Sequence, residues 1–148
     1  MHDLFKEIKN DHQEVKSMLE KLKESTGPKN RENLLKQFII ELKPHMEAEE
    51  KAFYPVLADK KESREQALEA LEEHHVAELV LKELEKGDKS GDQWKAKMQV
   101  FGELLEHHIE EEEDEVFEAA REVLDEKKIS EIYESFQNVK QKMKKKLS

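Results

Sequence analysis

The stretches FIIELKPHMEAEEKAF, residues 38–53, and FGELLEHHIEEEEDEV, residues 101–116, decide the fold of this chain. Both carry apolar residues at helical spacing. Both also place a histidine and a glutamate four residues apart on that apolar face, as His45 with Glu49 and His108 with Glu112. Residues four apart lie on one side of a helix. Because a buried ionised side chain is costly unless it is paired, these stretches predict helices that direct ligands into a core.

The two stretches belong to an internal repeat. The His45/Glu49 and His108/Glu112 pairs are separated by an offset of 63 residues, and a second matching pair of segments has an offset of 62. In that second pair, Asp11-His12 followed by Val15, Met18, Leu19 and Leu22 matches Glu73-His74 followed by Ala77, Val80, Leu81 and Leu84. A duplicated helix pair with short loops predicts an all-α fold, an antiparallel up-down-up-down four-helix bundle with pseudo-two-fold symmetry.

Apolar periodicity and helix breakers set the expected boundaries. We expect bundle helices over about 3–24, 30–59, 63–86 and 92–124, and an additional C-terminal helix over about 129–146. Pro44 is expected to kink the second helix, since its ring removes a backbone hydrogen bond. At this length the whole chain, 1–148, is expected to form a single domain, with the bundle over about 3–124.

Composition narrows the function classes. The net charge of −10 argues against nucleic acid as the main partner, since phosphates repel such a surface. The N-terminus has no apolar segment of a signal peptide, and no run approaches 18 apolar residues, so we expect a cytoplasmic protein without a membrane span. Five lysines among the last nine residues suit a helix C-terminus and leave open a weak contact with an anionic surface. The sequence does not indicate an oligomeric state.

With no cysteine, any metal must be held by nitrogen and oxygen. Taken singly, each histidine could be a hydrogen-bonded core residue, and Glu112 could belong to a solvated acidic run, Glu110–Glu115. Their matching repeat positions favour a dinuclear site instead, in which Glu49 and Glu112 bridge two ions that each take two histidines. Imidazole and carboxylate suit iron, manganese and zinc, and an oxygen-rich pair suits iron best. The predicted metal ligands are His12, His45, Glu49, His74, His108 and Glu112.

Helical phase separates the ligands from neighbouring candidates. His75 is in phase with Glu78 and Lys82, so it should face solvent, whereas His107 should pack beside the site. His2 should have no role. Glu78 is a less favoured seventh ligand.

The segments DHQEV at His12, HMEAEEKAFYP at His45, EEHHVAEL at His74 and HHIEEEEDEVF at His108 closely resemble hemerythrin-like, or HHE cation-binding, domains. The resemblance covers about residues 3–124. It implies a bundle around two iron ions, oxo- or hydroxo-bridged, with His12, His45, His74 and His108 as terminal ligands and Glu49 and Glu112 as bridges.

The chain departs from the oxygen-carrying hemerythrins at two places. Glu78 stands where they have a further histidine, and the last ligand pair, His108 and Glu112, is four residues apart rather than five. Fewer histidines leave more open coordination positions. We therefore expect a protein that binds or senses O2, with NO or peroxide as other ligands. The alternatives are a di-iron redox enzyme, either an oxidase or a peroxide-consuming protein, and a structural metal bundle that acts through partners.

Overall fold

The computed structural model describes residues 3–148, and helices account for almost all of them. In chain order they are α1 (Leu4–Glu24), α2 (Pro28–Ala48), η1 (Glu49–Phe53), α3 (Tyr54–Ala58), α4 (Arg64–Lys86), α5 (Asp92–Glu111), η2 (Glu112–Val116), α6 (Phe117–Val123) and α7 (Glu126–Leu147). The elements η1 and η2 are single π-helical turns. Each joins two α-helices into one longer rod, α2–η1–α3 and α5–η2–α6.

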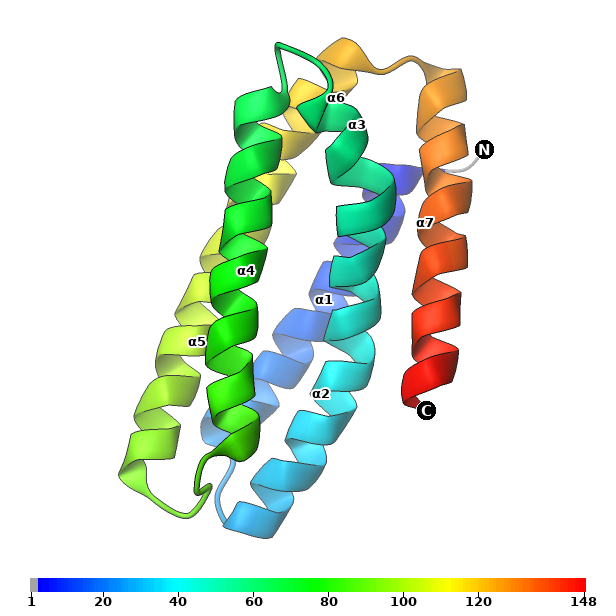
Figure 1. Cartoon of the computed structure of the whole chain (residues 1–148). Coiled ribbons are helices and arrows are strands. Elements are labelled where there is room, and N and C mark those ends of the chain that lie inside the picture. Colours follow the sequence, from blue (N-terminus) through cyan, green and yellow to red (C-terminus); the bar gives the residue numbers. More distant parts are fainter. Residues whose placement is uncertain (1–2) are drawn as a thin grey trace.

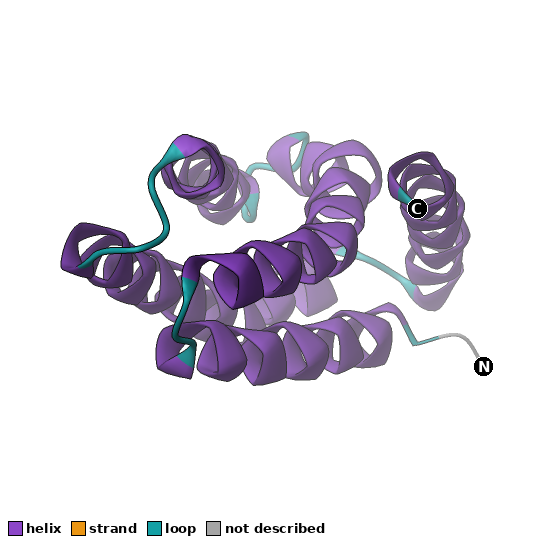
Figure 2. Ribbon diagram, turned by 90° about the horizontal axis from the view of Figure 1, so that it is seen from below, coloured by secondary structure: helices purple, strands orange, loops and turns teal. Residues whose placement is uncertain are grey.

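Four rods form the bundle, with α1, α2, α4 and α5 alternating in direction (Figure 1). The helix α1 packs against α2 and α5, and α4 packs against α5 and α3. The additional helix α7 lies outside this square of rods, against α2, η1 and α1 (Figure 2). The expected fold class, an antiparallel four-helix bundle with a C-terminal helix, is confirmed.

Local chemistry sets the helix ends. The Asp3 carboxylate accepts hydrogen bonds from the backbone N–H groups of Phe5 and Lys6, which α1 would otherwise leave unpaired. Gly27 adopts φ +81°, and Pro28 then begins α2, where a missing N–H costs nothing. The Asp125 carboxylate accepts the Lys128 N–H at 2.8 Å, so α7 begins at Glu126, three residues earlier than apolar periodicity alone predicts.

The kink expected at Pro44 in the second rod stays a prediction. The helix α2 continues through Pro44, and α-helical geometry gives way only at Glu49, where η1 begins.

Among residues 3–148, no helix is both long enough and apolar enough to cross a bilayer.

Two apolar clusters fill the bundle, one at each end. One includes Ile8, Ala48, Ala70 and Val116, and the other includes Val15, Leu42, Ala77 and Leu105. On every rod, one predicted ligand histidine falls between a member of the first cluster and a member of the second. The bundle is therefore built as apolar core, polar layer, apolar core.

Leu19 tests the packing of the second cluster. It is fully buried there, so Leu19→Ala should lower the free energy of unfolding by about 2–5 kcal/mol through lost burial and a residual cavity. Leu79→Ala is the matched control, because Leu79 is 50% exposed and its truncation should change stability by no more than about 0.5 kcal/mol. Urea denaturation at equal metal occupancy measures both, and equal losses would contradict this packing.

Candidate metal centre

The six predicted ligands meet in the polar layer, and all six are buried. They fall into two groups of donor atoms that could each hold a metal ion. The first half-site is His12, His45, Glu49 and Glu112, and the second half-site is Glu49, His74 and His108. Because Glu49 belongs to both groups, the geometry is that of two adjacent cation positions with a shared carboxylate.

Distances within the layer show how the carboxylates lie. Glu49 Oε1 is 3.3 Å from His45 Nε2 and 3.2 Å from His74 Nε2, so it lies between the two half-sites. Glu112 Oε1 is 2.9 Å from His12 Nε2, and its other oxygen points toward the second half-site. Within residues 3–148, the buried side-chain atoms without a hydrogen-bond partner are His45 Nε2, both Glu49 oxygens and Glu112 Oε1. Unpaired polar atoms at this depth are costly, and a cation between them would remove that cost.

Each histidine predicted as a ligand turns its Nε2 inward because a carboxylate accepts a hydrogen bond from its Nδ1–H. We call these four acceptors the supporting carboxylates. The pairs are His12 with Glu113 at 2.7 Å, His45 with Asp11 at 2.8 Å, His74 with Glu50 at 2.8 Å and His108 with Glu73 at 2.6 Å. Such partners fix the tautomer and the ring orientation of metal-binding histidines.

The supporting carboxylates follow the internal repeat. Asp11 and Glu73 each precede a ligand histidine on one rod and support the histidine on the next rod in sequence. Glu50 and Glu113 each follow a glutamate that is predicted to bridge the ions, Glu49 and Glu112. All four were missed as functional residues at the sequence level, although each stands directly beside a predicted ligand.

Both π-helical turns begin at the predicted bridging glutamates. The N–H of Tyr54 bonds to the Glu49 carbonyl, and the N–H of Phe117 bonds to the Glu112 carbonyl, each across five residues instead of four. Isolated π turns inside α-helices are frequent at functional sites. Pro55 lacks an N–H and suits the first turn, but Glu118 stands at the equivalent position of the second. The feature common to both turns is the buried glutamate.

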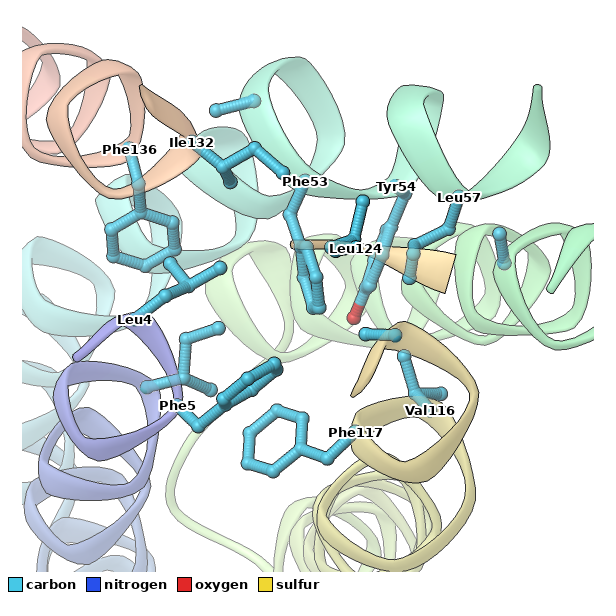
Figure 3. Close-up of a cluster of buried hydrophobic side chains, with 14 of the residues drawn as sticks. Leu4, Phe5, Phe53, Tyr54, Leu57, Val116, Phe117, Leu124, Ile132 and Phe136 are labelled. Atoms are coloured by element: carbon cyan, nitrogen blue, oxygen red, sulfur yellow. The ribbon is translucent and has the colours of Figure 1, made fainter. Parts of the chain in front are cut away.

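The first π turn brings a further residue into the site, Tyr54. Its hydroxyl donates a hydrogen bond to Glu112 Oε2 and lies 3.5 Å from the Nε2 atoms of both His74 and His108. Figure 3 shows the ring packed beside Phe53 among apolar side chains, with its hydroxyl at the far end. The repeat equivalent of Tyr54 is Phe117, which packs on Phe5 with ring centroids 4.9 Å apart. The phenol therefore distinguishes the second half-site from the first.

The imidazoles and carboxylates also shift each other's protonation. Burial, which lowers the pKa of His45, is outweighed by the charge of Glu49 and the hydrogen bond to Asp11, so that pKa rises to about 10. For His74, burial is outweighed by Glu49 and Glu50, and the pKa rises to about 9. The pKa of Glu49 lies well below its usual value, because its burial is outweighed by His45. Burial, and then the charge of Glu49, raise the pKa of Glu112.

The comparisons with known proteins agree with this geometry. The family model described as "Hemerythrin HHE cation binding domain" matches residues 3–120. The chain belongs to the hemerythrin HHE cation-binding domain family. The crystal structure of an HHE cation-binding domain-containing protein from Mycobacterium kansasii is similar in fold, with a TM-score of 0.85 and 23% identity, over 99% of this chain and 90% of that one. No curated protein sequence matches the chain.

The other candidate residues near the centre of this HHE domain differ in where they lie. His75 is exposed, as expected, but the prediction that His107 packs beside the site is wrong. The His107 side chain is 66% exposed and its Nε2 lies 3.3 Å from Glu111 Oε1 at the surface. Glu78 belongs to neither half-site and lines a surface pocket among α2, α4 and α7 instead. His2 lies outside the described residues.

Carboxamide substitutions in the HHE domain should rank the carboxylates by their place in the centre. Glu49→Gln should remove one or both ions, because a neutral amide is a poor shared ligand. Glu50→Gln should weaken metal affinity by about 10–100-fold, since it supports His74 without touching the metal. Glu110→Gln is the control, because Glu110 is exposed. Metal analysis after gel filtration measures all three, and an equal loss in the Glu110 variant would contradict the arrangement.

The raised histidine pKa values predict opposite pH dependences for stability and for metal binding. Protonated His45 and His74, with ordinary pKa values of 6.5 and folded values of about 10 and 9, stabilise the apoprotein fully below about pH 6.5. That contribution is lost as pH rises through those folded values. A metal ion must displace the same protons from His45 and His74. The apparent Zn2+ affinity should therefore rise as the pH rises from about 6.5 toward those folded values.

Thermal melts of the apoprotein and Zn2+ titrations in buffers of different ionisation enthalpy check the two trends. A Zn2+ affinity that is independent of pH between about 6 and 9, with no proton release, would contradict the assignment of these protons.

Proposed function

We propose that this HHE domain, as a single domain over residues 1–148, holds two iron ions and binds a small ligand such as O2 at them. One observation carries the proposal: two buried donor groups share Glu49, and four of their ligand atoms have no hydrogen-bond partner within the described residues, 3–148. In the proposed centre, His12 and His45 serve one ion, His74 and His108 serve the other, and Glu49 and Glu112 bridge them.

The donor types support iron. The centre offers imidazole nitrogen and carboxylate oxygen and no sulfur, a combination that suits iron, manganese or zinc. Glu49 and Glu112 between two histidine pairs would hold two ions close together and would leave each with fewer protein ligands than an octahedral ion accepts. When bound, the iron pair supplies open coordination positions and a change of oxidation state.

The space beside the ligands supports a small, uncharged ligand. A cavity of about 10 Å³ lies against His12, His45, Glu49, His74 and His108, which is room for about one water-sized group. Its remaining walls are apolar and come from the second cluster: Val15, Leu42, Met46, Leu105 and Ile109. A space this small and this apolar excludes a larger organic substrate and favours a small, uncharged ligand.

The protein groups around the cavity divide the remaining work. The supporting carboxylates hold the imidazoles in place, and the apolar wall excludes bulk water. Tyr54 places a hydroxyl within hydrogen-bonding range of the second half-site. Because burial and then the charge of Glu112 raise its pKa well above the usual value, this phenol stays protonated, and its single O–H would turn from Glu112 to a bound ligand.

Tyr54 also favours a second candidate function, redox turnover of O2 or peroxide. A buried phenol next to a metal centre can supply a proton to a ligand as that ligand is reduced. Binding and turnover use the same residues, and they differ in whether the bound ligand is released unchanged or is reduced.

Mixing the reduced, iron-loaded protein with O2 tests both functions. Reversible binding predicts two iron ions per chain and an oxygen-dependent absorbance that disappears on deoxygenation. Rapid, irreversible oxidation supports turnover, and one ion or none after iron reconstitution contradicts both.

Tyr54→Phe tests the role of the phenol, because it removes the hydroxyl and keeps the ring. Loss of one hydrogen bond of about 1–1.5 kcal/mol should speed ligand dissociation by about tenfold. Tyr133→Phe is the matched control, because Tyr133 lies on α7 and pairs with Gln137. Identical dissociation rates in the two variants would contradict this role.

A further inference from the structure

The helix α7 buries a lysine against α1. Lys140 is 7% exposed, and it is the buried lysine among residues 3–148. Its ammonium lies 2.5 Å from Glu7 Oε2 and 3.1 Å from each oxygen of Asp11. A buried ammonium costs free energy unless it is paired, and here the two carboxylates, one turn apart on α1, provide that pairing.

Asp11 links this ammonium to the metal centre. The Asp11 carboxylate accepts the Nδ1–H of the ligand His45 at 2.8 Å, so one carboxylate lies between Lys140 and His45. Phe136, one turn before Lys140, packs its ring on His45 itself, with centroids 5.8 Å apart and planes at 79°. The helix α7 therefore reaches His45 twice, once directly and once through Asp11.

The repeat provides an internal comparison. The equivalent of Asp11 is Glu73, which supports His108. Within residues 3–148, no lysine is paired with Glu73; its neighbours are the Glu111 carboxyl and the exposed imidazole of His107, which lies 3.3 Å from Glu111. Asp11 thus has a buried ammonium behind it, whereas its repeat equivalent Glu73 has a carboxyl group and an exposed imidazole.

The charge beside a supporting carboxylate also affects how strongly the supported histidine can donate to a metal ion. An ammonium paired with Asp11 draws negative charge away from the Nδ1–H of His45. An imidazole whose partner carboxylate carries less charge is a weaker donor at Nε2. Glu73 is paired with no buried ammonium, and its neighbours are the Glu111 carboxyl and the exposed imidazole of His107, so His108 is the stronger donor of the two.

We propose that Lys140 is a positioning residue of the metal centre, which acts through Asp11 on His45 and makes the two half-sites chemically unequal. This inference rests on the proposed dinuclear centre. It assigns to α7, which lies beyond the residues that the family model matches, a role in the properties of the metal site.

The test is a double-mutant cycle between Lys140 and Asp11, read as the reduction midpoint of the iron-loaded protein. Lys140→Met removes the ammonium and keeps much of the stem, and it should shift the midpoint to a lower potential. The same Lys140→Met substitution should cause no shift in the Asp11→Asn background, where the carboxylate between Lys140 and His45 is already removed. Lys140→Arg keeps the positive charge and should leave the midpoint at the wild-type value. Equal shifts in both backgrounds would show a through-space charge effect only and overturn the proposal.

Lys144→Met is the matched control. Lys144 lies one turn further along α7 and pairs at 3.5 Å with Glu41, which supports no ligand. It loses the same charge from the same helix, so its midpoint should stay near that of the wild type. A shift as large as that of Lys140→Met would overturn the proposal.

A second readout needs no iron and separates this proposal from the proposed function. In apoprotein with 15N-labelled histidine, Lys140→Met should move the ring signals of His45 and leave those of His74 and His108 in place. A wild-type protein that holds no metal pair, with these His45 changes present, overturns the proposed function alone. An unmoved His45 ring overturns the coupling. Should Lys140→Met fail to fold, the Glu7→Gln background relieves the unpaired charge and allows the same comparison.

Discussion

The burial of ionisable ligands in one layer is the constraint on which the rest of this HHE domain depends. Four imidazoles and two carboxylates divide the core into two apolar clusters, and each of these imidazoles needs a partner on its outer side to hold its Nε2 toward the centre of the layer. The supporting carboxylates meet that need across rods, from α1 to α2 and from η1 to α4, for example. Through these links, the positions of the rods relative to one another follow from the requirements of the centre.

Much of the bundle and of the candidate metal centre could be predicted from the sequence, because the predicted ligands share the helical period of the core. His45 and Glu49 repeat at four residues, as apolar positions do, and the duplication indicated the phase of His74 against His75. His107 was predicted wrongly because its apolar phase-mates, Val100 and Leu104, are themselves exposed on this surface. Periodicity identifies a face of a helix, but it does not show that another helix covers that face.

Tyr54 was missed for a different reason. Five α-helical steps of about 100° would turn it about 140° away from Glu49. The π turn needs more residues per turn and returns Tyr54 to the face of the ligands. The supporting carboxylates were missed because an acid next to a ligand, such as Glu50, lies off the ligand face. It reaches a neighbouring rod instead, and the position of that rod follows only from the tertiary structure.

The π turns have a consequence for how such a chain can vary. Each is equivalent to one extra residue inside a continuous rod, placed after a glutamate whose position the centre requires. Deleting one residue from η1 would leave Glu49 in register with His45 but would rotate the following segment, so that Phe53 and Tyr54 could no longer both face inward. The metal layer and the apolar cluster beyond it are therefore phased independently along one helix. An alignment of related sequences should therefore allow a single-residue gap at this point and at the equivalent point in η2, because the extra residue belongs to the π turn.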